Sequence, residues 1–513
     1  MEKVLTAVAQ LVRYGIEKHL IEPSDAVYAR NGLLTLLKID RYEEVDCEAQ
    51  PPLEEILAVL LDYAASAGLI DGESITERDL FDTALMGVLT PRPSEVQKTF
   101  FALHAEKGAR AASDYFISLA KDSDYIRTYR VKKDRKWKTP SLYGEMDITI
   151  NLSKPEKDPR AIAAAAKMKS GYPACLLCHD NEGFSGNMSK PARQTLRQIP
   201  LQMGGERWYL QYSPYVYYNE HCIALSSEHT PMKISEKTFA RMLDFVSFLP
   251  HYFIGSNADL PIVGGSILSH DHMQGGCYEF AMERATIETP LYFDGFDTVT
   301  AGIVAWPMSV IRLRSSDRDA ISRLAVQILS SWRGYTDEDA FVFAETEGVS
   351  HHTVTPIARR RGEDFELDLV LRDNITTSEH PLGVYHPHAE LHHIKKENIG
   401  LIEVMGLAVL PARLSREIAK MTAYLKNPAT AVSSVENDPE TASHGDWLAE
   451  ILPQYPRVQS GTADESEITA MLENEIGRVF VRVLEDAGVY KRTEEGKRAF
   501  LRFALFAGGK ESR

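Results

Sequence analysis

Apolar residues near the start of the chain recur at the spacing of an amphipathic helix. They lie three or four positions apart in two segments, at Leu5, Val8, Leu11, Val12 and Ile16 and at Ile56, Val59, Leu60 and Tyr63. Side chains with this spacing share one face of a helix. We therefore predict a mainly helical region over residues 1–165, and a helical extension over 426–513 that includes a helix from Glu465 to Ala487.

The middle of the chain alternates apolar and polar residues, as half-buried strands do. Met146–Asn151 is the clearest example. The pattern predicts further strands at Tyr125–Val131, Trp208–Ser213, Thr300–Trp306 and Phe365–Arg372, and helices at Lys237–Leu249 and Asp319–Trp332. Strands and helices therefore intermix between the two helical regions.

One stretch, from Asp259 to Gly276, combines an apolar run with evenly spaced polar side chains. We predict a strand over Ile262–Leu268 that continues into His270, His272 and Gln274. Alternate residues of an extended chain point to the same side, so the two imidazoles and the amide would share one face. This face is the strongest candidate for an active site.

Glycine pairs flank this stretch, at Gly264–Gly265 and Gly275–Gly276. Bare backbone lets a ligand approach closely and presents N–H groups to an anion. Imidazole is largely neutral near pH 7 and can attack phosphorus, giving a phosphoramidate that a second acceptor cleaves. Gln274 can donate an N–H to a phosphoryl oxygen but cannot deliver a proton, which favours a waiting covalent intermediate over hydrolysis.

Composition excludes some classes of protein. The chain has 513 residues, 44% of them hydrophobic and 25% charged, as in an ordinary globular protein of two to four structural units. Its formal net charge of −16 argues against a nucleic-acid partner. It has no apolar run of membrane-spanning length and no secretory pattern at its start, so we expect no membrane partner and a cytoplasmic protein.

The five cysteines, at positions 47, 175, 178, 222 and 277, are too few for a disulfide framework and fit a reducing compartment. Cys175 and Cys178 form a CxxC, which is either a redox pair or half of a metal site. The redox interpretation lacks a thioredoxin-like context. A zinc site needs two more ligands, for which His229 and His270 are candidates. Two buried cysteines without a metal are the alternative.

A second histidine-rich run repeats the spacing of the first. His386-x-His388-x-Glu390 follows a glycine and a short apolar segment, as His270-x-His272-x-Gln274 does. Each run also has a strand–helix–strand lead-in. We interpret the pair as a divergent internal duplication.

Two long motifs carry a family resemblance. Asp259 to Gly276 and His392 to Pro411 resemble the signatures of the class II galactose-1-phosphate uridylyltransferases, and the likeness extends over essentially the whole chain. The resemblance implies an α+β fold of the histidine-triad superfamily. Its two related halves would be a catalytic half at 166–300 and a second half at 301–425. It also implies ping-pong transfer of UMP from UDP-glucose to galactose 1-phosphate, without an organic cofactor. Class I relatives pair into dimers, so a homodimer is one expectation, and the oligomeric state stays open.

The resemblance also implies roles for single residues. His272 would be the uridylylated nucleophile and Gln274 would hold the phosphoryl oxygens. Shorter, class I relatives have prolines where Asp271 and Met273 stand here. The matching structural zinc set is Cys175, Cys178, His229 and His270. We expect substrate contacts at Asn257, Gly264, Gly265, Ser266, Ser269, Lys395 and Lys396.

Two other functions remain open at this point. The first is a dinucleotide hydrolase or phosphorylase that uses the same histidine. The second is a non-catalytic, zinc-stabilised nucleotide-binding protein. For Lys395 and Lys396, a solvated charged face is the alternative to substrate contact. The residues alone do not choose the sugar.

Overall fold

The computed structural model describes residues 1–45, 50–152, 171–265 and 267–511. The chain forms two compact units and crosses between them several times. Unit 1 comprises Met1–Lys133, Ser153–Thr230 and His270–His272, and unit 2 comprises Asp134–Leu152, Pro231–Ser269 and Met273–Arg513. Ser266, one of the expected substrate contacts, lies outside the described residues.

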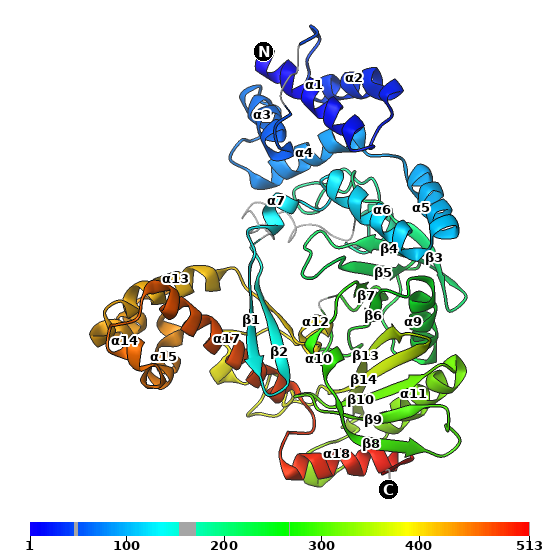
Figure 1. Cartoon of the computed structure of the whole chain (residues 1–513), viewed down its shortest axis with the longest axis vertical. Helices are drawn as coiled ribbons and strands as arrows, with labels where there is room; N and C mark the ends of the chain where they lie inside the picture. Colours follow the sequence, from blue (N-terminus) through cyan, green and yellow to red (C-terminus); the bar gives the residue numbers. More distant parts are fainter. Residues whose placement is uncertain (46–49, 153–170, 266, 512–513) are drawn as a thin grey trace. The chain divides into compact units, whose positions relative to one another are not determined.

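Unit 1 begins with the helices that the apolar spacing predicts (Figure 1). They are α1 (Glu2–Glu17), α2 (Ala26–Leu36), α3 (Leu53–Ser66), α4 (Ile75–Leu89), α5 (Pro93–Lys107), α6 (Ala109–Asp122) and α7 (Thr128–Val131). Val4, Leu5, Val8, Leu11 and Val12 of α1 are buried, and α1 packs against α2 and α3. The predicted strand at Tyr125–Val131 is wrong, since its second half forms α7.

A small antiparallel sheet completes unit 1. Its strands are β3 (Ile199–Met203), β4 (Glu206–Tyr212) and β5 (Cys222–Ser226), with β4 paired to both neighbours. β4 confirms the strand predicted at Trp208–Ser213. The chain reaches β3 from β2 (Gly144–Ile150), a strand of unit 2. Between these two strands, the short helical turn His179–Asn181 follows the CxxC.

Unit 2 contains a longer, antiparallel run of strands. In order across the sheet these are β16 (Gly509–Glu511), β8 (Ile287–Phe293), β9 (Thr300–Val304), β10 (Val310–Ser315), β14 (Asp364–Asp373), β13 (His352–Arg361), β6 (Phe253–Gly255) and β7 (His272–Gly276). β7 begins at His272, the last residue of unit 1, and its other residues belong to unit 2. A second sheet joins β1 (Arg135–Ser141), β2 (Gly144–Ile150) and β15 (Leu407–Leu410), and β11 (Glu345–Thr346) pairs with β12 (Val349–Ser350).

Two amphipathic helices cover the long sheet of unit 2. α9 (Glu236–Phe248) and α11 (Arg318–Arg333) pack against each other and against β13. Asp317 caps α11 by accepting hydrogen bonds from the N–H groups of Asp319 and Ala320. The buried face of α11 repeats at helical spacing: Ile321, Leu324, Ala325, Ile328, Leu329 and Trp332.

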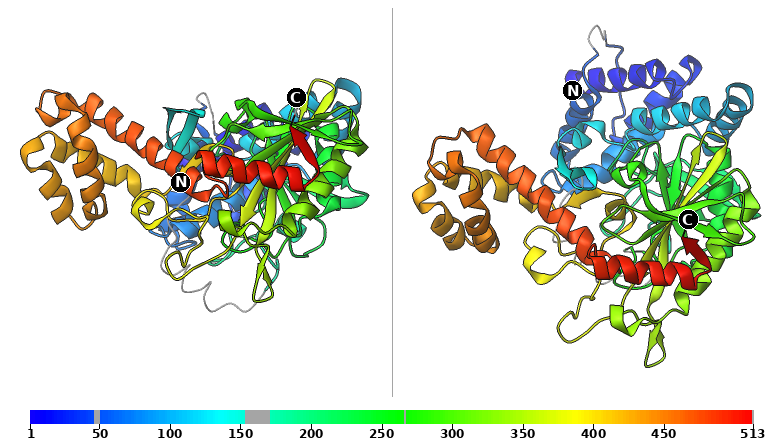
Figure 2. Two further views of the ribbon diagram at one scale, coloured as in Figure 1. Left: turned by 90° about the horizontal axis from the view of Figure 1, so that it is seen from below. Right: turned by 60° about the horizontal axis from the view of Figure 1, so that its bottom comes forward.

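The other helices of unit 2 are short ones near the sheets and a helical C-terminal part. They are α10 (Ala281–Arg284), α12 (Leu401–Val404), α13 (Arg413–Leu425), α14 (Pro428–Asn437), α15 (Gly445–Ile451), α16 (Pro456–Gln459), α17 (Glu465–Ala487) and α18 (Glu494–Phe506). Figure 2 shows α17 and α18 following one another towards the C-terminal strand. The α+β class is confirmed, with a mainly helical N-terminal part and C-terminal helices.

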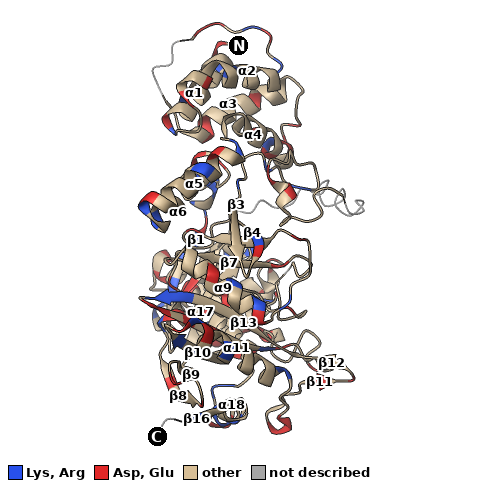
Figure 3. Cartoon of the chain, turned by 90° about the vertical axis from the view of Figure 1, so that its right-hand side faces the viewer, with Lys and Arg blue, Asp and Glu red and all other residues tan. Residues whose placement is uncertain are grey.

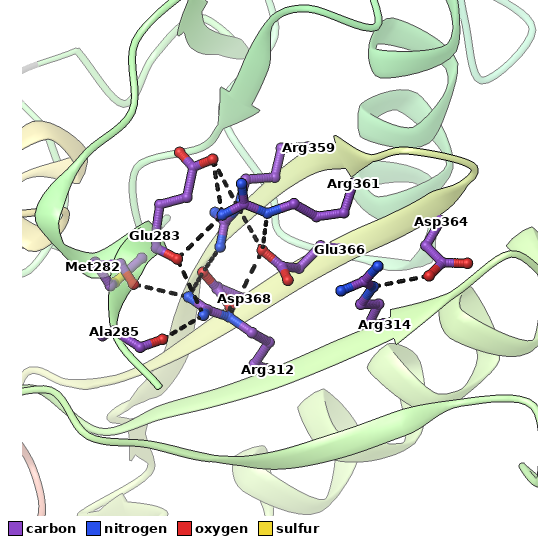
Figure 4. Close-up of polar contacts among 10 residues, drawn as sticks. All are labelled: Met282, Glu283, Ala285, Arg312, Arg314, Arg359, Arg361, Asp364, Glu366 and Asp368. Atoms are coloured by element: carbon purple, nitrogen blue, oxygen red, sulfur yellow. Dashed lines mark hydrogen bonds and ion pairs between the residues drawn. The ribbon is translucent and has the colours of Figure 1, made fainter. Parts of the chain in front are cut away.

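A buried charge cluster joins the sheet of unit 2 to the segment that follows β7 (Figure 4). It contains three guanidinium groups and three carboxylates, from Arg312, Arg359, Arg361, Glu283, Glu366 and Asp368. Arg312 makes two hydrogen bonds to Asp368, at 2.6 and 2.9 Å, and donates to the backbone carbonyls of Met282 and Ala285. Burial opposes ionisation of Asp368, yet Arg359 and Arg312 lower its pKa to about 2. Asp368 therefore stays ionised, and the hydrogen bonds that Arg312 makes to it and to the two carbonyls hold α10, which begins five residues after the last residue of β7.

Charged residues elsewhere do not gather by sign along the elements labelled in Figure 3, where basic and acidic positions are interspersed. Among the residues that the structure describes, none of the helices combines the length and apolar character needed to cross a bilayer.

Candidate active site and metal centre

The stretch from Asp259 to Gly276 contains a strand, but this strand begins further along the chain than predicted. The described residues of Ile262–Leu268 are not in a strand: Pro261–Val263 form a turn, Gly264 makes one isolated bridge to Ala258, and β7 begins only at His272. β7 nevertheless contains both His272 and Gln274, two positions apart. Its alternation points them to the same side, as expected of an extended chain.

The His272 imidazole is buried and held in one orientation. Its Nδ1 lies 2.8 Å from the backbone carbonyl of His270. A carbonyl can only accept, so Nδ1 carries the proton and Nε2 carries the lone pair. Burial lowers the pKa of this imidazole. The neutral ring with its lone pair on Nε2 has the form that a base or a nucleophile requires.

Four candidate metal ligands lie together in unit 1: Cys175, Cys178, His229 and His270. The two Sγ atoms are 3.5 Å apart, and Cys175 Sγ lies 3.3 Å from His270 Nδ1. Cys178 Sγ lies 3.2 Å from His229 Nδ1 and 3.7 Å from His270 Nδ1. Ligands around a tetrahedral zinc ion are about 3.3–3.8 Å apart, given Zn–S of about 2.3 Å and Zn–N of about 2.0 Å. Two thiols and two imidazoles at these separations fit a closed, structural site.

The surroundings of this group orient its members as metal ligands require. His270 Nε2 lies 2.9 Å from the backbone carbonyl of Ser226, so its proton is on Nε2 and Nδ1 faces the sulfurs. The Asn181 side chain donates to the carbonyls of both Cys175 and Cys178, each at 2.8 Å. The Nδ1 lone pair of His270 therefore faces both sulfurs, as a ligand atom around a shared ion does.

Unit 2 adds Gln274 and the loop that follows the paired strand β6. Gln274 pairs with Gly255 in the ladder, and Asn257 lies two residues beyond Gly255. Asn257 is buried, and its Oδ1 accepts a hydrogen bond from Leu401 N at 2.8 Å. A Cβ at Gly265 would lie only 2.5 Å from Asn257 Nδ2. The loop therefore returns over its own beginning, and only glycine fits there.

Comparison with known proteins identifies the family. A model described as the galactose-1-phosphate uridyl transferase N-terminal domain matches residues 19–231, and one described as its C-terminal domain matches residues 246–438. A Fusobacterium nucleatum galactose-1-phosphate uridylyltransferase is 49% identical over 99% of this chain and 100% of its own length. The chain belongs to the galactose-1-phosphate uridylyltransferase family. The resemblance drawn from the two motifs is confirmed.

Other members of the galactose-1-phosphate uridylyltransferase family are equally similar. That of Caldanaerobacter subterraneus is 50% identical, with 98% of each chain covered. That of Bacillus subtilis is 47% identical over 99% of this chain and 98% of its own. Among solved structures, a yeast Ap4A phosphorylase aligns with 72% of this chain and 92% of its own at 10% identity, with a TM-score of 0.30. We base no argument on that alignment.

The two lysines expected at the substrate of this uridylyltransferase family member differ in their surroundings. Lys395 is buried, with Nζ 3.0 Å from a Glu403 oxygen and 3.3 Å from the carbonyl of Val409. Although burial acts in the opposite direction, Glu403 and Glu397 raise the pKa of Lys395. Lys396 is exposed. Lys396 is thus the lysine whose ammonium group can meet a ligand, while Lys395 holds an internal ion pair.

The second histidine-rich run is not a strand. Gly383–His388 form turns and irregular backbone, and Glu390 lies in the short helical turn Ala389–Leu391. His388, Glu390 and Asp486 lie close enough to share a cation, although Glu390 is exposed. Sequence reasoning missed Asp486, because it is 98 positions from His388 and no local pattern joins them.

Proposed function

We propose that this protein transfers UMP from UDP-glucose to galactose 1-phosphate, giving UDP-galactose and glucose 1-phosphate. Membership of the uridylyltransferase family supports the reaction. The observation that carries the mechanism is the His272 imidazole, whose Nδ1–H is held by the His270 carbonyl and whose neutral form is favoured by burial. Such an imidazole suits a covalent uridylyl intermediate on Nε2.

In the first half-reaction the Nε2 lone pair attacks the uridylyl phosphorus of UDP-glucose. The bond from this phosphorus to the bridging oxygen breaks, and glucose 1-phosphate leaves with the electron pair. The imidazole gains positive charge, which the hydrogen bond from Nδ1–H to the His270 carbonyl stabilises. In the second half-reaction a phosphate oxygen of galactose 1-phosphate attacks the same phosphorus. The P–N bond breaks and His272 returns to its neutral form.

Gln274 and the backbone of Gly264 and Gly265 would hold the phosphoryl oxygens. An amide and N–H groups can donate hydrogen bonds to these oxygens without protonating the leaving group. Asn257 positions this backbone through its contacts with Gly265 and Leu401. Two exposed residues are further candidate contacts: Lys396, and Ser269, which precedes β7 in the chain.

We also propose that Cys175, Cys178, His229 and His270 hold a structural zinc ion. Four protein ligands leave no open position for water or substrate, so the ion would stabilise the fold. The ligand His270 provides the carbonyl that orients His272. Bracing His270 would therefore also fix the tautomer and orientation of the nucleophile.

A single-turnover experiment with UDP-glucose alone tests the function. We expect release of one glucose 1-phosphate per chain and retention of acid-labile UMP on the protein. Galactose 1-phosphate should then discharge the label as UDP-galactose. Continuous release of UMP into water would contradict the transferase and favour the hydrolase. Phosphorolysis of a dinucleotide without a burst from UDP-glucose would favour the phosphorylase, and binding without turnover would favour the non-catalytic protein.

A further inference from the structure

The loop between β6 and β7 contains a strained turn at Ile262. The backbone φ of Ile262 is +73°, and Val263 N–H donates to the Pro261 carbonyl at 2.8 Å. This is the three-residue γ-turn with positive φ, which is rare and strained. A β-branched side chain makes the conformation more costly still. Among the described residues with positive φ, Val216 is the other β-branched one.

Tertiary contacts hold the loop before the turn. Asp259 Oδ2 accepts a hydrogen bond from Ile234 N at 2.8 Å, and Asp259 Oδ1 accepts one from Thr353 Oγ1. Arg333 lies 3.6 Å from the same carboxylate. These contacts come from the segment before α9, from β13 and from the end of α11, so the start of the loop is fixed by three separate elements.

Close backbone packing holds the loop after the turn. A Cβ at Gly264 would lie 2.6 Å from the carbonyl oxygens of Ala258 and Leu260. Gly265 lies over Asn257 in the same way. Strain of this kind persists only where the surroundings over-determine the conformation. Here both ends are pinned, and Ile262 is where the chain reverses between them.

The Ile262 side chain contacts the second histidine-rich run. A Cβ at Gly383 would lie 2.9 Å from Ile262 Cγ2 and 3.1 Å from the His386 Cβ. Gly383 itself has a φ of +121°, a conformation that favours glycine. Ile262 therefore packs directly over a glycine, where any larger residue would displace the turn.

We infer that Ile262 and Gly383 are positioning residues for the phosphate-holding loop. The strained turn places Gly264 against the Ala258 and Leu260 carbonyls and Gly265 against Asn257, which lies two residues beyond the partner of Gln274 in the ladder. The Ile262–Gly383 contact keeps the turn closed before substrate binds. Substrate binding then costs less conformational entropy, because the loop is already ordered. This inference rests on the proposed function, because it assumes that the loop holds the uridylyl phosphate.

Ile262→Gly tests the turn, because glycine keeps the backbone conformation accessible, relieves the strain and removes the contact with Gly383. We expect a burst of glucose 1-phosphate that keeps its amplitude of one per chain but has a rate constant about tenfold lower, since small misplacements cost up to ~100-fold. The melting temperature should be unchanged or higher. Val216→Gly is the matched control in unit 1, and its burst rate should equal that of the wild type.

Each result supports or overturns the inference. A lower amplitude with an unchanged rate constant, together with a lower melting temperature, would mean that Ile262 serves only the fold. A wild-type rate constant in Ile262→Gly would also overturn the inference, while the intact burst would leave the proposed function standing. Absence of a burst in the wild type would instead remove the proposed function itself.

A double-mutant cycle tests the contact between the two residues. Gly383→Ala should lower the burst rate constant, because its Cβ would press on Ile262 Cγ2. The loss should be smaller in an Ile262→Ala background, where this carbon is absent. Losses that simply multiply would show that the two residues act independently and would overturn the pairing.

Discussion

The two histidine-rich runs share a spacing but not a structure. His272 and Gln274 lie two positions apart in β7, and Gln274 pairs with Gly255 in the ladder between β6 and β7. His386 and His388 lie in irregular backbone, and Pro387 between them has no N–H to donate to a ladder. The same spacing of three polar residues therefore presents its side chains differently in the two runs. Orientation comes from the strand partner and not from the spacing.

The two runs also differ in the state of their imidazoles. The proton of His272 is fixed on Nδ1, which leaves the lone pair on Nε2, the proposed nucleophile. In His388, Nε2 lies 3.2 Å from the Val384 carbonyl and Nδ1 lies 3.7 Å from the Asp486 carboxylate. Both nitrogens of His388 thus face oxygen acceptors, whereas the carbonyl of His270 meets Nδ1 of His272. This difference is why we propose the nucleophile in the first run.

The substitution with the largest expected effect tests which of the two runs contains the nucleophile. His272→Gly should abolish the UDP-glucose burst and lower steady-state transfer by at least about 1000-fold, because loss of a nucleophile removes the covalent route. His388→Gly makes the same change in the second run and should stay within a few-fold of the wild type. Rapid-quench measurement of glucose 1-phosphate reports both. A burst that survived in His272→Gly would reverse the assignment.

The third positions of the runs provide a smaller contrast. Gln274→Ala removes the proposed amide donor and should lower the burst rate constant by about 10- to 100-fold, with His272 still labelled at the end point. Glu390→Ala, at the exposed matching position, should leave the rate unchanged. The measurement is a time course of UMP retention on the protein. Equal effects of the two changes would argue that Gln274 does not touch the transferred group.

Metal content tests the proposed zinc ligands, of which His270 belongs to the first run. Cys175→Ser removes one of four ligands, so bound zinc measured by mass spectrometry should fall well below one per chain. The melting temperature should fall by several degrees, because the ion stabilises the folded state alone. Cys277→Ser is the control, since Cys277 lies outside the ligand group. Unchanged metal in Cys175→Ser would reject the proposed site.

Several helices and part of the proposed metal site could be predicted from the sequence, because each depends on residues that are close together in the chain. The buried face of α11 and the bounds of α17 follow from helical periodicity. The CxxC signals half of a metal site, and the family resemblance adds His229 and His270. The loop at Pro261–Gly265 is different. Its apolar residues predict a strand, yet contacts of Asp259 with Ile234 and Thr353 impose a turn. Asp486 is likewise joined to His388 only by the tertiary fold.

A pair of histidines beyond the second run gives the smallest expected effect. His393 Nδ1 lies 2.8 Å from His444 Nδ1, and His444 Nε2 lies 3.0 Å from Glu417. Burial, followed by His444, Arg413 and Arg482, lowers the pKa of His393 to about 3. Glu417 is itself paired with Arg413 at 2.6 Å. This pair therefore folds with the His393 ring neutral.

The sign of the pH dependence follows from that lowered pKa. The unfolded chain has a His393 pKa of about 6.5, so between pH 6.5 and 3 the unfolded state binds more protons than the folded state. The contribution of His393 to stability is complete above pH 6.5 and decreases as the pH falls, by at most about 2 kcal/mol at pH 5. Urea unfolding at pH 7.5 and pH 5 should show this loss, and His393→Gln should show less of it. An equal loss in His393→Gln would place the acid sensitivity elsewhere. In that case the stability lost at pH 5 would not come from the buried His393 that follows the second histidine-rich run, and other titratable groups would account for it.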